Sequence, residues 1–375
     1  IIHCEMPFPG PGLTPGWDRK HYKKWSFTIV KLETDGGIAG VGIQAWGRMA
    51  EFLIAEHVKS YLLKREIDIF EIERHWRWLY NLSLRTGVRL WGFEVALWDI
   101  IGKSLGKPIF KLLGGCQDRV KAYAATMLLK SPEERAKDAV KLLEEGFRAI
   151  KIRAHHDDPA RDLEVVKAVR DAVGDDMDIM VDANQRFYDV PPVWSRRTAL
   201  KMAKALDKLD VYWLEEPLYY DDLEGLAHLA ASVDMYIAGG EGEQGLQRFR
   251  LLLEMGCFDI VQPDVLSFGF IGLKKVSALA EAYNRLVVPH VGSIIGLSLV
   301  IGLQGVGALP NCPYVEVGYE PPIVTRELRN QILEEPIWID RDGYIEIPKN
   351  PGLGVELNWK TIEKWKIKET LIKSA

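Results

Sequence analysis

The sequence contains few cysteines, and they show no pairing pattern. Cys4, Cys116, Cys257 and Cys312 are far apart, and none belongs to a Cys-x-x-Cys motif. Zinc ribbons and disulfide-rich secreted folds both require closely spaced cysteines, so neither class is predicted. Scattered cysteines are compatible with a reducing compartment, and we expect a cytoplasmic protein.

A strong excess of one charge is also lacking. The 375 residues include 48 basic and 53 acidic side chains, which gives a net charge of −5. Nucleic-acid binding is therefore not expected, because it normally requires a basic surface. An anionic substrate would have to be attracted locally, by a metal ion or a few cationic side chains.

The chain has no long uninterrupted apolar run. Residues 291–309 are the most apolar segment, but Gly, Ser and Gln interrupt them, which favours a buried helix over a membrane span. Residues 1–17 contain no basic region followed by an apolar core, so a signal peptide is not predicted. We expect a soluble protein without a membrane partner.

Residues 1–118 are predicted to form an α+β capping domain. Residues 1–16 are rich in Pro and Gly, which predicts a loop, and residues 25–45 resemble a β-hairpin around an Asp-Gly-Gly turn. Residues 50–112 contain several amphipathic helical stretches that end at Leu-Leu-Gly-Gly. The tryptophans of residues 75–80 have helical spacing, which is more typical of core packing than of a binding platform.

From residue 119 the pattern changes to short apolar runs separated by helical stretches of about ten to fifteen residues. These helical stretches are predicted to begin near Pro132, Ala160, Pro192, Asp222, Gly245, Gly272 and Gly296. Eight such runs occur before residue 319: VKAYAATM, RAIKIRA, DIMVDAN, VYWLEEP, MYIAGGE, FDIVQPDV, RLVVPHV and YVEVG. This alternation predicts an α/β fold in which residues 119–318 close into a (β/α)7β-type TIM barrel. Residues 319–375 are extended and Pro-rich, and we expect them to return to the capping domain.

Polar side chains end most of these runs. Catalytic groups of such barrels lie at the C-terminal ends of the strands, so these side chains should meet at one mouth. They are Lys151, Arg153, Asp182, Glu215, Glu241, Asp264, His290 and Glu316.

Three carboxylates, Asp182, Glu215 and Glu241, end the third, fourth and fifth runs. Without a cation, carboxylates gathered at one place repel one another. Oxygen ligands with no Cys or His among them suit Mg²⁺ and suit zinc poorly. Taken singly, Asp182 could cap a helix and Glu215 could simply end a strand, but the set of three predicts one Mg²⁺ ion per active site.

Asp264 and His290 end successive runs, 26 residues apart. A carboxylate beside a histidine fixes the tautomer of the ring and raises its basicity, as a general base requires. A histidine satisfied within the core is the simpler alternative for His290 alone. Its pairing with Asp264 favours the catalytic interpretation.

Six short motifs contain these polar side chains or lie beside them. In chain order they are VDANQ at 181–185, WLEEP at 213–217, GGE at 239–241, VQPD at 261–264, VPH at 288–290 and VEV at 315–317. Together they resemble the enolase superfamily and, within it, the mandelate racemase subgroup. The flanking residues 96–115 and 350–357 are also similar to that subgroup, so the resemblance covers almost the whole chain.

The resemblance implies that Asp182, Glu215 and Glu241 bind Mg²⁺ and that Asp264 and His290 form the acid/base pair. It also implies that Glu316 lies near the carboxylate of the substrate. Removing a proton next to a carboxylate creates a second negative charge, which a bound divalent cation stabilises.

Further candidates for substrate binding lie in the VDANQ motif and in the first loops of the capping domain, at about residues 3–22 and 44–50. Their mixture of polar and aromatic side chains suits a hydroxylated acid. They are Asn184, His3, Trp17, Trp46 and Arg48.

The second run departs from the subgroup. The subgroup often has a Lys-x-Lys motif at this place, in which the second lysine acts as a base. This chain has Lys151-Ile-Arg153 instead. Arginine stays protonated and is a poor base. We therefore expect dehydration of a sugar acid to a 2-keto-3-deoxy acid, with Lys151 and Arg153 binding the substrate and stabilising charge.

Other functions remain open at this point. A racemase or epimerase of the same superfamily is the first alternative. A barrel that binds metal without catalysis, and a metal-dependent hydrolase, are the others. A hydrolase commonly needs histidine ligands, and the strand ends supply only His290. We also expect a homo-oligomer that acts on a small hydroxy-carboxylate.

Overall fold

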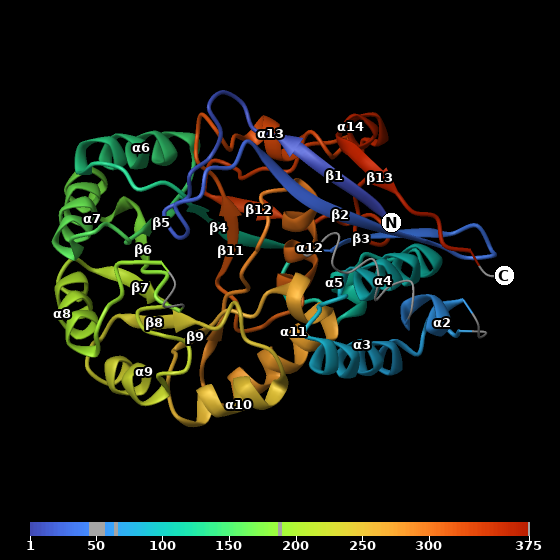
Figure 1. The fold of residues 1–375 in the computed structure, drawn as a ribbon, viewed down its shortest axis with the longest axis horizontal. Helices are drawn as coiled ribbons and strands as arrows, with labels where there is room; N and C mark the ends of the chain where they lie inside the picture. Colours follow the sequence, from blue (N-terminus) through green and yellow to red (C-terminus); the bar gives the residue numbers. More distant parts are fainter. Residues whose placement is uncertain (45–56, 64–66, 187–189, 374–375) are drawn as a thin grey trace.

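The computed structural model describes residues 1–44, 57–63, 67–186 and 190–373. Two of the predicted substrate-binding residues, Trp46 and Arg48, lie outside these ranges. The chain forms an α+β capping domain beside a barrel of parallel strands surrounded by helices (Figure 1). The predicted fold class is therefore confirmed.

The capping domain contains a four-stranded antiparallel sheet in the order β13-β1-β2-β3. The hairpin predicted for residues 25–45 is confirmed as β2 and β3. The loop predicted for residues 1–16 is wrong at its start, because residues 2–7 form β1 between β2 and β13, a strand that lies more than 350 residues away along the chain. The strands are β1 (Ile2–Pro7), β2 (Lys24–Glu33), β3 (Ala39–Gln44) and β13 (Lys366–Glu369).

Helices cover one face of this sheet, and two glycines allow the closest of them to approach. A Cβ atom on Gly40 would lie 2.1 Å from the Ala96 carbonyl oxygen, and one on Gly42 would lie 2.1 Å from the Gly92 carbonyl oxygen. Helix α4 can therefore rest directly on β3. The helices are α2 (Lys59–Leu62), α3 (Ile72–Thr86), α4 (Gly92–Leu105) and α5 (Ile109–Leu112).

All eight predicted apolar runs are parallel strands. They follow one another in the order β11-β4-β5-β6-β7-β8-β9-β10 and curl into the barrel. Because helices cover the outer face, most strand residues are buried on both sides of the sheet. The strands are β4 (Arg119–Ala125), β5 (Ala149–Arg153), β6 (Asp178–Asp182), β7 (Val211–Glu215), β8 (Tyr236–Gly239), β9 (Ile260–Val261), β10 (Leu286–Val287) and β11 (Tyr314–Gly318).

In the described part of the chain, seven α-helices connect these strands, and local capping sets where several of them begin. Ser131 and Glu134 form a reciprocal capping box at the start of α6, with Pro132 as the first helical residue. Helix α8 begins later than the predicted Pro192, and α11 begins earlier than the predicted Gly272. The helices are α6 (Pro132–Glu145), α7 (Pro159–Val173), α8 (Arg196–Asp207), α9 (Leu223–Ala230), α10 (Leu246–Glu254), α11 (Val265–Ala282) and α12 (Gly296–Val306).

The interior of the barrel is filled by side chains that alternate along the strands. Tyr123, Met180, Trp213 and Tyr314 belong to this inner cluster. Side chains two positions further along a strand point to the same side. The period of two therefore places Asp182 and Glu215 on the inner face at the carboxyl ends of β6 and β7, and Glu316 on the inner face in the middle of β11. Lys151 and Arg153 follow Ala149 along β5 in the same way.

The C-terminal segment contacts both parts of the molecule. Strand β12 (Tyr344–Glu346) pairs with the start of β4 in the barrel, whereas β13 pairs with β1 in the capping domain. Between them lies α14 (Trp359–Trp365), and α13 (Arg326–Asn330) precedes β12. The division of the chain at residues 118 and 318 stays a prediction.

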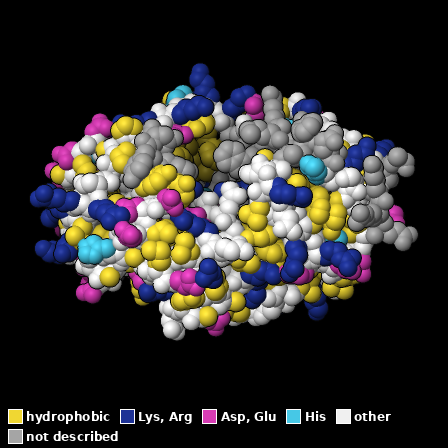
Figure 2. Space-filling view, turned by 60° about the horizontal axis from the view of Figure 1, so that its bottom comes forward, with side chains coloured by type: hydrophobic (Ala, Val, Ile, Leu, Met, Phe, Trp, Pro, Cys, Tyr) yellow, Lys and Arg dark blue, Asp and Glu magenta, His cyan; other side chains and the backbone are white. Residues whose placement is uncertain are grey.

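Positive and negative side chains are interspersed over the face of the molecule seen in Figure 2. None of the helices in the described part of the chain combines the length and apolar character needed to cross a membrane.

Candidate active site

A cavity of about 200 Å³ opens where the barrel strands end. Most of its wall comes from the barrel, and the capping domain adds Trp17 and Trp25. The sequence predicted Trp17 but not Trp25, which lies within β2 and has no chemical signal of its own. The lining residues are Trp17, Trp25, Ala125, Met127, Arg153, Asn184, Glu241, His290, Val291, Gly292, Ser293, Ile294, Glu316 and Gly318.

Glu215 lies at the bottom of the site, where it is fully buried. Lys151 Nζ lies 2.9 Å from Glu215 Oε1 and 3.0 Å from Oε2. Gln262 and Trp213 also donate to Oε2, from 2.9 and 3.2 Å. Burial and the neighbouring Asp182 carboxylate raise the pKa of Glu215, even though Lys151 opposes them. The carboxylates here are thus incompletely neutralised by this protein's own cations.

Asp182 ends β6 beside Glu215. Its Oδ2 atom pairs with Arg153 Nη1, and Lys151 Nζ lies 3.7 Å from the same oxygen. The Asn184 backbone N–H donates to Asp182 Oδ1 over 2.9 Å, and Arg153 Nη1 donates to Asn184 Oδ1 over 3.2 Å. Asn184, with φ of 47°, thus turns its side chain toward the cavity that it lines.

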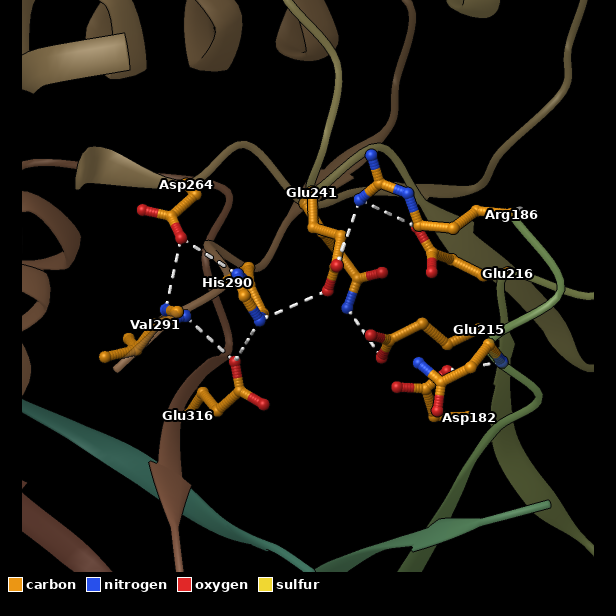
Figure 3. A network of polar contacts seen from close by, with 12 residues as sticks. Asp182, Arg186, Glu215, Glu216, Glu241, Asp264, His290, Val291 and Glu316 are labelled. Atoms are coloured by element: carbon orange, nitrogen blue, oxygen red, sulfur yellow. Dashed lines mark hydrogen bonds and ion pairs between the residues drawn. The ribbon is translucent and has the colours of Figure 1, made fainter. Parts of the chain in front are cut away.

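Glu241 follows β8 and is paired with Arg186, for which the sequence predicted no role. Arg186 Nη1 lies 3.0 Å from Glu241 Oε1 and 3.5 Å from Glu216 Oε1 (Figure 3). The side chain lies against the backbone at Gly242, where a Cβ atom would overlap it. The signal available in the sequence was only a basic residue one position after VDANQ, which has no function by itself.

Glu216, next to Glu215, is also buried. Burial and the nearby Glu241 carboxylate raise its pKa well above the usual range. Among the described residues, no donor is within hydrogen-bond distance of Glu216 Oε2. The mouth of the barrel therefore carries more buried carboxylate than its cationic side chains compensate.

The donor set at this mouth fits a hard divalent cation in its chemistry. Asp182, Glu215 and Glu241 supply only carboxylate oxygens. In the structure these carboxylates form ion pairs with cationic side chains. Across the part of the chain that the structure describes, no three acidic, His or Cys side chains are grouped closely enough to hold a metal ion. The predicted ligands thus lie at the ends of neighbouring strands, and each is paired with a cationic side chain: Asp182 with Arg153, Glu215 with Lys151 and Glu241 with Arg186.

His290 and Asp264 meet as the sequence predicted. His290 Nδ1 lies 2.9 Å from Asp264 Oδ2, which also accepts from the Gly292 backbone N–H over 3.1 Å. Asp264 Oδ1 accepts from the Leu266 backbone N–H over 2.6 Å, so the carboxylate is held as the N-cap of α11. Figure 3 shows His290 between Asp264 on one side and Glu241 and Glu316 on the other.

The other ring nitrogen of His290 faces carboxylates of the cavity. Nε2 lies 3.2 Å from Glu241 Oε2 and 3.9 Å from Glu316 Oε2. Burial lowers the pKa of His290, but the carboxylates of Glu241, Glu316 and Asp264 outweigh it and raise the pKa to about 10. The neighbouring carboxylates therefore favour the positively charged imidazolium form of His290.

Glu316 and Lys151 form a second buried pair. Glu316 Oε1 lies 3.0 Å from Lys151 Nζ, and Oε2 accepts from the Val291 backbone N–H over 2.9 Å. Burial opposes ionisation of Glu316, but Lys151 and His290 lower its pKa to about 2. Lys151 itself is fully buried, and the described residues that line the cavity do not include it.

His3 is not brought to this site. It lies buried in β1 of the capping domain, where its Nδ1 is 2.8 Å from Thr28 Oγ1, and it is absent from the described lining of the cavity. Arg153, in contrast, lines the cavity with its guanidinium 4.6 Å from the centre of the Trp17 ring.

Two family descriptions match the chain in succession. Residues 18–114 match the mandelate racemase/muconate lactonizing enzyme N-terminal domain, and residues 134–361 match the enolase C-terminal domain-like family. The chain belongs to the mandelate racemase/muconate lactonizing enzyme family of the enolase superfamily. The predicted family membership is confirmed.

The relatives of this enolase-superfamily protein include dehydratases and cycloisomerases. Arabinonate dehydratase of Saccharolobus solfataricus is 34% identical, with 90% of each chain covered. D-galactarolactone cycloisomerase of Agrobacterium fabrum is 30% identical, with 98% of this chain and 97% of the relative covered.

Two of the similar solved structures contain magnesium. L-talarate dehydratase from Polaromonas sp. JS666, complexed with Mg and L-glucarate, is 28% identical with a TM-score of 0.81, covering 99% of this chain and 96% of that one. A racemase from Streptomyces coelicolor with bound magnesium is 26% identical with a TM-score of 0.83, covering 98% of each chain.

Proposed function

We propose that this protein dehydrates a sugar acid to a 2-keto-3-deoxy acid. The observation that carries the proposal is the Asp264–His290 pair facing a cavity in which Arg153 occupies the place of a second basic lysine. Arabinonate and L-rhamnonate dehydratases among the relatives support the same reaction class. The substrate is then a small hydroxy-carboxylate.

Asp182, Glu215 and Glu241 would hold one Mg²⁺ ion at the mouth of the barrel. A divalent cation bound there stabilises the second negative charge that develops on the substrate carboxylate when the α-proton leaves. Glu241 is the carboxylate nearest to His290 Nε2, and its electrostatic interaction with the ring is the largest single contribution that raises the pKa of His290. Engaging Glu241 with a cation would weaken this interaction and so favour the neutral ring that a general base requires.

His290 is the proposed acid/base residue. Its Nε2 atom accepts the α-proton, and the electrons of the C–H bond move into the enediolate. The same nitrogen then returns a proton to the departing β-hydroxyl, the C–O bond breaks, water leaves, and the enol product becomes the 2-keto acid. Asp264 holds the ring in place through its contact with Nδ1.

Arg153 and Lys151 take different parts in this proposal. Arg153 lines the cavity and can donate to the substrate carboxylate or a hydroxyl group. Lys151 is enclosed by Glu215, Glu316 and Asp182, so it acts by stabilising charge beneath the cavity. Neither supplies a neutral base on the opposite face of the substrate.

A racemase or epimerase is the second candidate. A racemase among the structural neighbours and a cycloisomerase among the relatives support it. Both reactions begin with removal of the same proton, so the fate of the β-hydroxyl separates them.

Incubation with a library of monoacid and diacid sugars in ²H₂O, with Mg²⁺, tests the proposal. NMR follows α-deuteration, inversion and 2-keto product in one sample. We expect the 2-keto-3-deoxy acid to accumulate for at least one sugar acid. Exchange with inversion and no loss of water would replace the proposal with the racemase. If the protein binds Mg²⁺ but exchanges the α-proton of no acid in the library, the proposal is wrong and the protein is a metal-binding barrel without catalytic activity.

The cytoplasmic location and the homo-oligomeric state expected from the sequence stay predictions.

A further inference from the structure

Arg89 connects the capping domain to two active-site loops. These are residues 240–245 after β8 and residues 262–268 after β9, which include the first turn of α11 up to its interruption at Gly269. Arg89 lies between α3 and α4 and is partly buried. Its Nη1 atom donates to Ser267 Oγ over 2.6 Å, and its Nη2 atom donates to the Gly242 carbonyl oxygen over 2.9 Å. With its amide oxygen turned toward the guanidinium, Gln244 accepts from Nη2 at 2.9 Å and from Nε at 3.1 Å. One side chain thus donates to two separate loops of the barrel.

Each loop carries a residue of the proposed chemistry. Gly242 directly follows Glu241, and Ser267 is three residues after Asp264. The loops leave different strands, β8 and β9, so no local backbone hydrogen-bond pattern of a single helix or turn determines their spacing. His290 lies between them, 3.2 Å from Glu241 and 2.9 Å from Asp264.

The start of α11 needs support from outside its own helix. The helix is interrupted at Gly269, where φ is 70° and ψ is 173°, so residues 265–268 are separated from the regular turns that follow. Beyond this interruption, Glu94 accepts from the Phe270 and Ile271 backbone N–H groups over 2.9 and 3.1 Å. At the interruption, Trp76 Nε1 donates to the Phe268 carbonyl oxygen over 3.0 Å.

A guanidinium is suited to setting the spacing of two loops. It is planar, and its donors point in fixed directions, so one rigid group sets two acceptor positions at once. A small displacement of a catalytic group is costly for the reaction, because proton transfer and ligand binding depend on distances of a few tenths of an ångström.

We propose that Arg89 is a positioning residue that fixes Glu241 and Asp264 relative to His290. It does not line the described cavity and so acts through these residues, not on the substrate. The part that concerns Asp264 rests on the proposed function. The part that concerns Glu241 depends only on cation binding.

The first test is a titration of the full-length protein with Mg²⁺ alone, in which isothermal titration calorimetry measures the binding affinity. We expect Arg89→Met to weaken Mg²⁺ binding by about tenfold or more, the effect typical of losing a group that orients a ligand. Lys275→Met is the matched control. Lys275 Nζ joins α11 to Glu73 of α3 over 2.6 Å and lies 4.8 Å from the centre of the Trp76 ring. This variant therefore also removes a cation from the contact between the capping domain and the barrel, but not one that donates to Gly242 or Ser267. Its Mg²⁺ affinity should stay within about twofold of the parent.

The second test separates the two loops. Ser267→Ala removes only the contact on the Asp264 side and retains the charge of Arg89. We expect kcat to fall severalfold, while KM and Mg²⁺ affinity stay within about twofold. Arg89→Lys should be intermediate between Arg89→Met and the parent, since one ammonium cannot reproduce both directed contacts. Thermal unfolding of each variant verifies that it is folded.

Folded Arg89→Met with parental Mg²⁺ affinity would overturn the proposal, as would an equal loss in Lys275→Met. If Arg89→Met does not fold, Arg89→Lys and Ser267→Ala decide in its place. If the parental protein dehydrates no sugar acid, the proposed function is wrong, and so is the part of this proposal that concerns Asp264. The Mg²⁺ titration would still test the part that concerns Glu241.

Discussion

Among single residues, the important property is which atom of each side chain is already engaged. His290 uses Nδ1 for Asp264 and presents Nε2 to the cavity, which is the arrangement a general base needs. Lys151 and Arg153 both carry positive charge on the inner face of β5. Only Arg153 reaches the lining of the cavity in the described structure, whereas Lys151 is enclosed by carboxylates.

We predict that His290→Asn lowers α-proton exchange by about 10²–10⁴-fold, the range expected for loss of a general base. Mg²⁺ affinity should be nearly unchanged, because the variant keeps Asp182, Glu215 and Glu241. Exchange is measured by NMR in ²H₂O and affinity by calorimetry. Substantial residual dehydration would show that another residue removes the proton.

Among the elements, the contact between α4 and α11 has an electrostatic consequence. Glu94 is fully buried, and burial raises its pKa from 4.5 to about 7, although Phe270, Ile271 and Trp98 donate hydrogen bonds to it. Between these two values the folded protein retains a proton that the unfolded chain has lost. The contribution of Glu94 to stability therefore falls as pH rises from about 4.5 to about 7.

We predict that Glu94→Gln reduces this pH dependence. A shift of this size corresponds to about 3 kcal/mol at most between pH 5 and pH 8, and the glutamine, which cannot ionise, should lack it. Urea unfolding of both proteins at the two pH values measures the difference. Equal pH dependence in the two proteins would contradict the raised pKa of Glu94.

In the whole molecule, the barrel mouth gathers carboxylates from three strands, and their mutual repulsion opposes folding. A cation that binds only the folded state stabilises it by mass action, by about 2.7 kcal/mol at one hundred times its Kd. For this protein the carboxylates involved are Asp182, Glu215 and Glu241, together with Glu216, whose pKa is raised by burial and by Glu241 despite its pairing with Arg186.

We predict that saturating Mg²⁺ raises the unfolding midpoint by several degrees over the chelator-treated protein. Asp182→Asn should remove most of this increase, since it deletes one proposed ligand. Asp178→Asn is the matched control: it makes the same change at the opposite end of β6. Differential scanning calorimetry with EDTA and with Mg²⁺ measures the midpoints. An equal increase in Asp182→Asn and the parent would place the cation elsewhere.

Local spacing in the sequence was sufficient for much of the architecture. Apolar runs and helical stretches alternate because each strand of a parallel barrel needs a covering helix, and this pattern located all eight strands. The period of two within a strand then brought Asp182, Glu215 and Glu316 to one face. The pairing of Asp264 with His290 followed from the same register.

Features that depend on contacts between distant segments were not predictable in this way. Strand β1 was missed because its partners β2 and β13 decide its conformation, against a local excess of Pro and Gly. Helix α11 begins at Val265, before the predicted start, because Asp264 caps its first turn and residues from the capping domain support the interruption at Gly269.

The sequence by itself determined the barrel, the capping domain and the acidic, basic and histidine side chains at the strand ends, because these follow from periodicity along the chain. Only the tertiary structure decided that Arg186 pairs with Glu241, that Trp25 lines the cavity and that Arg89 bridges two loops. Each of these contacts joins residues far apart in sequence, and their energy depends on distances that no local pattern encodes.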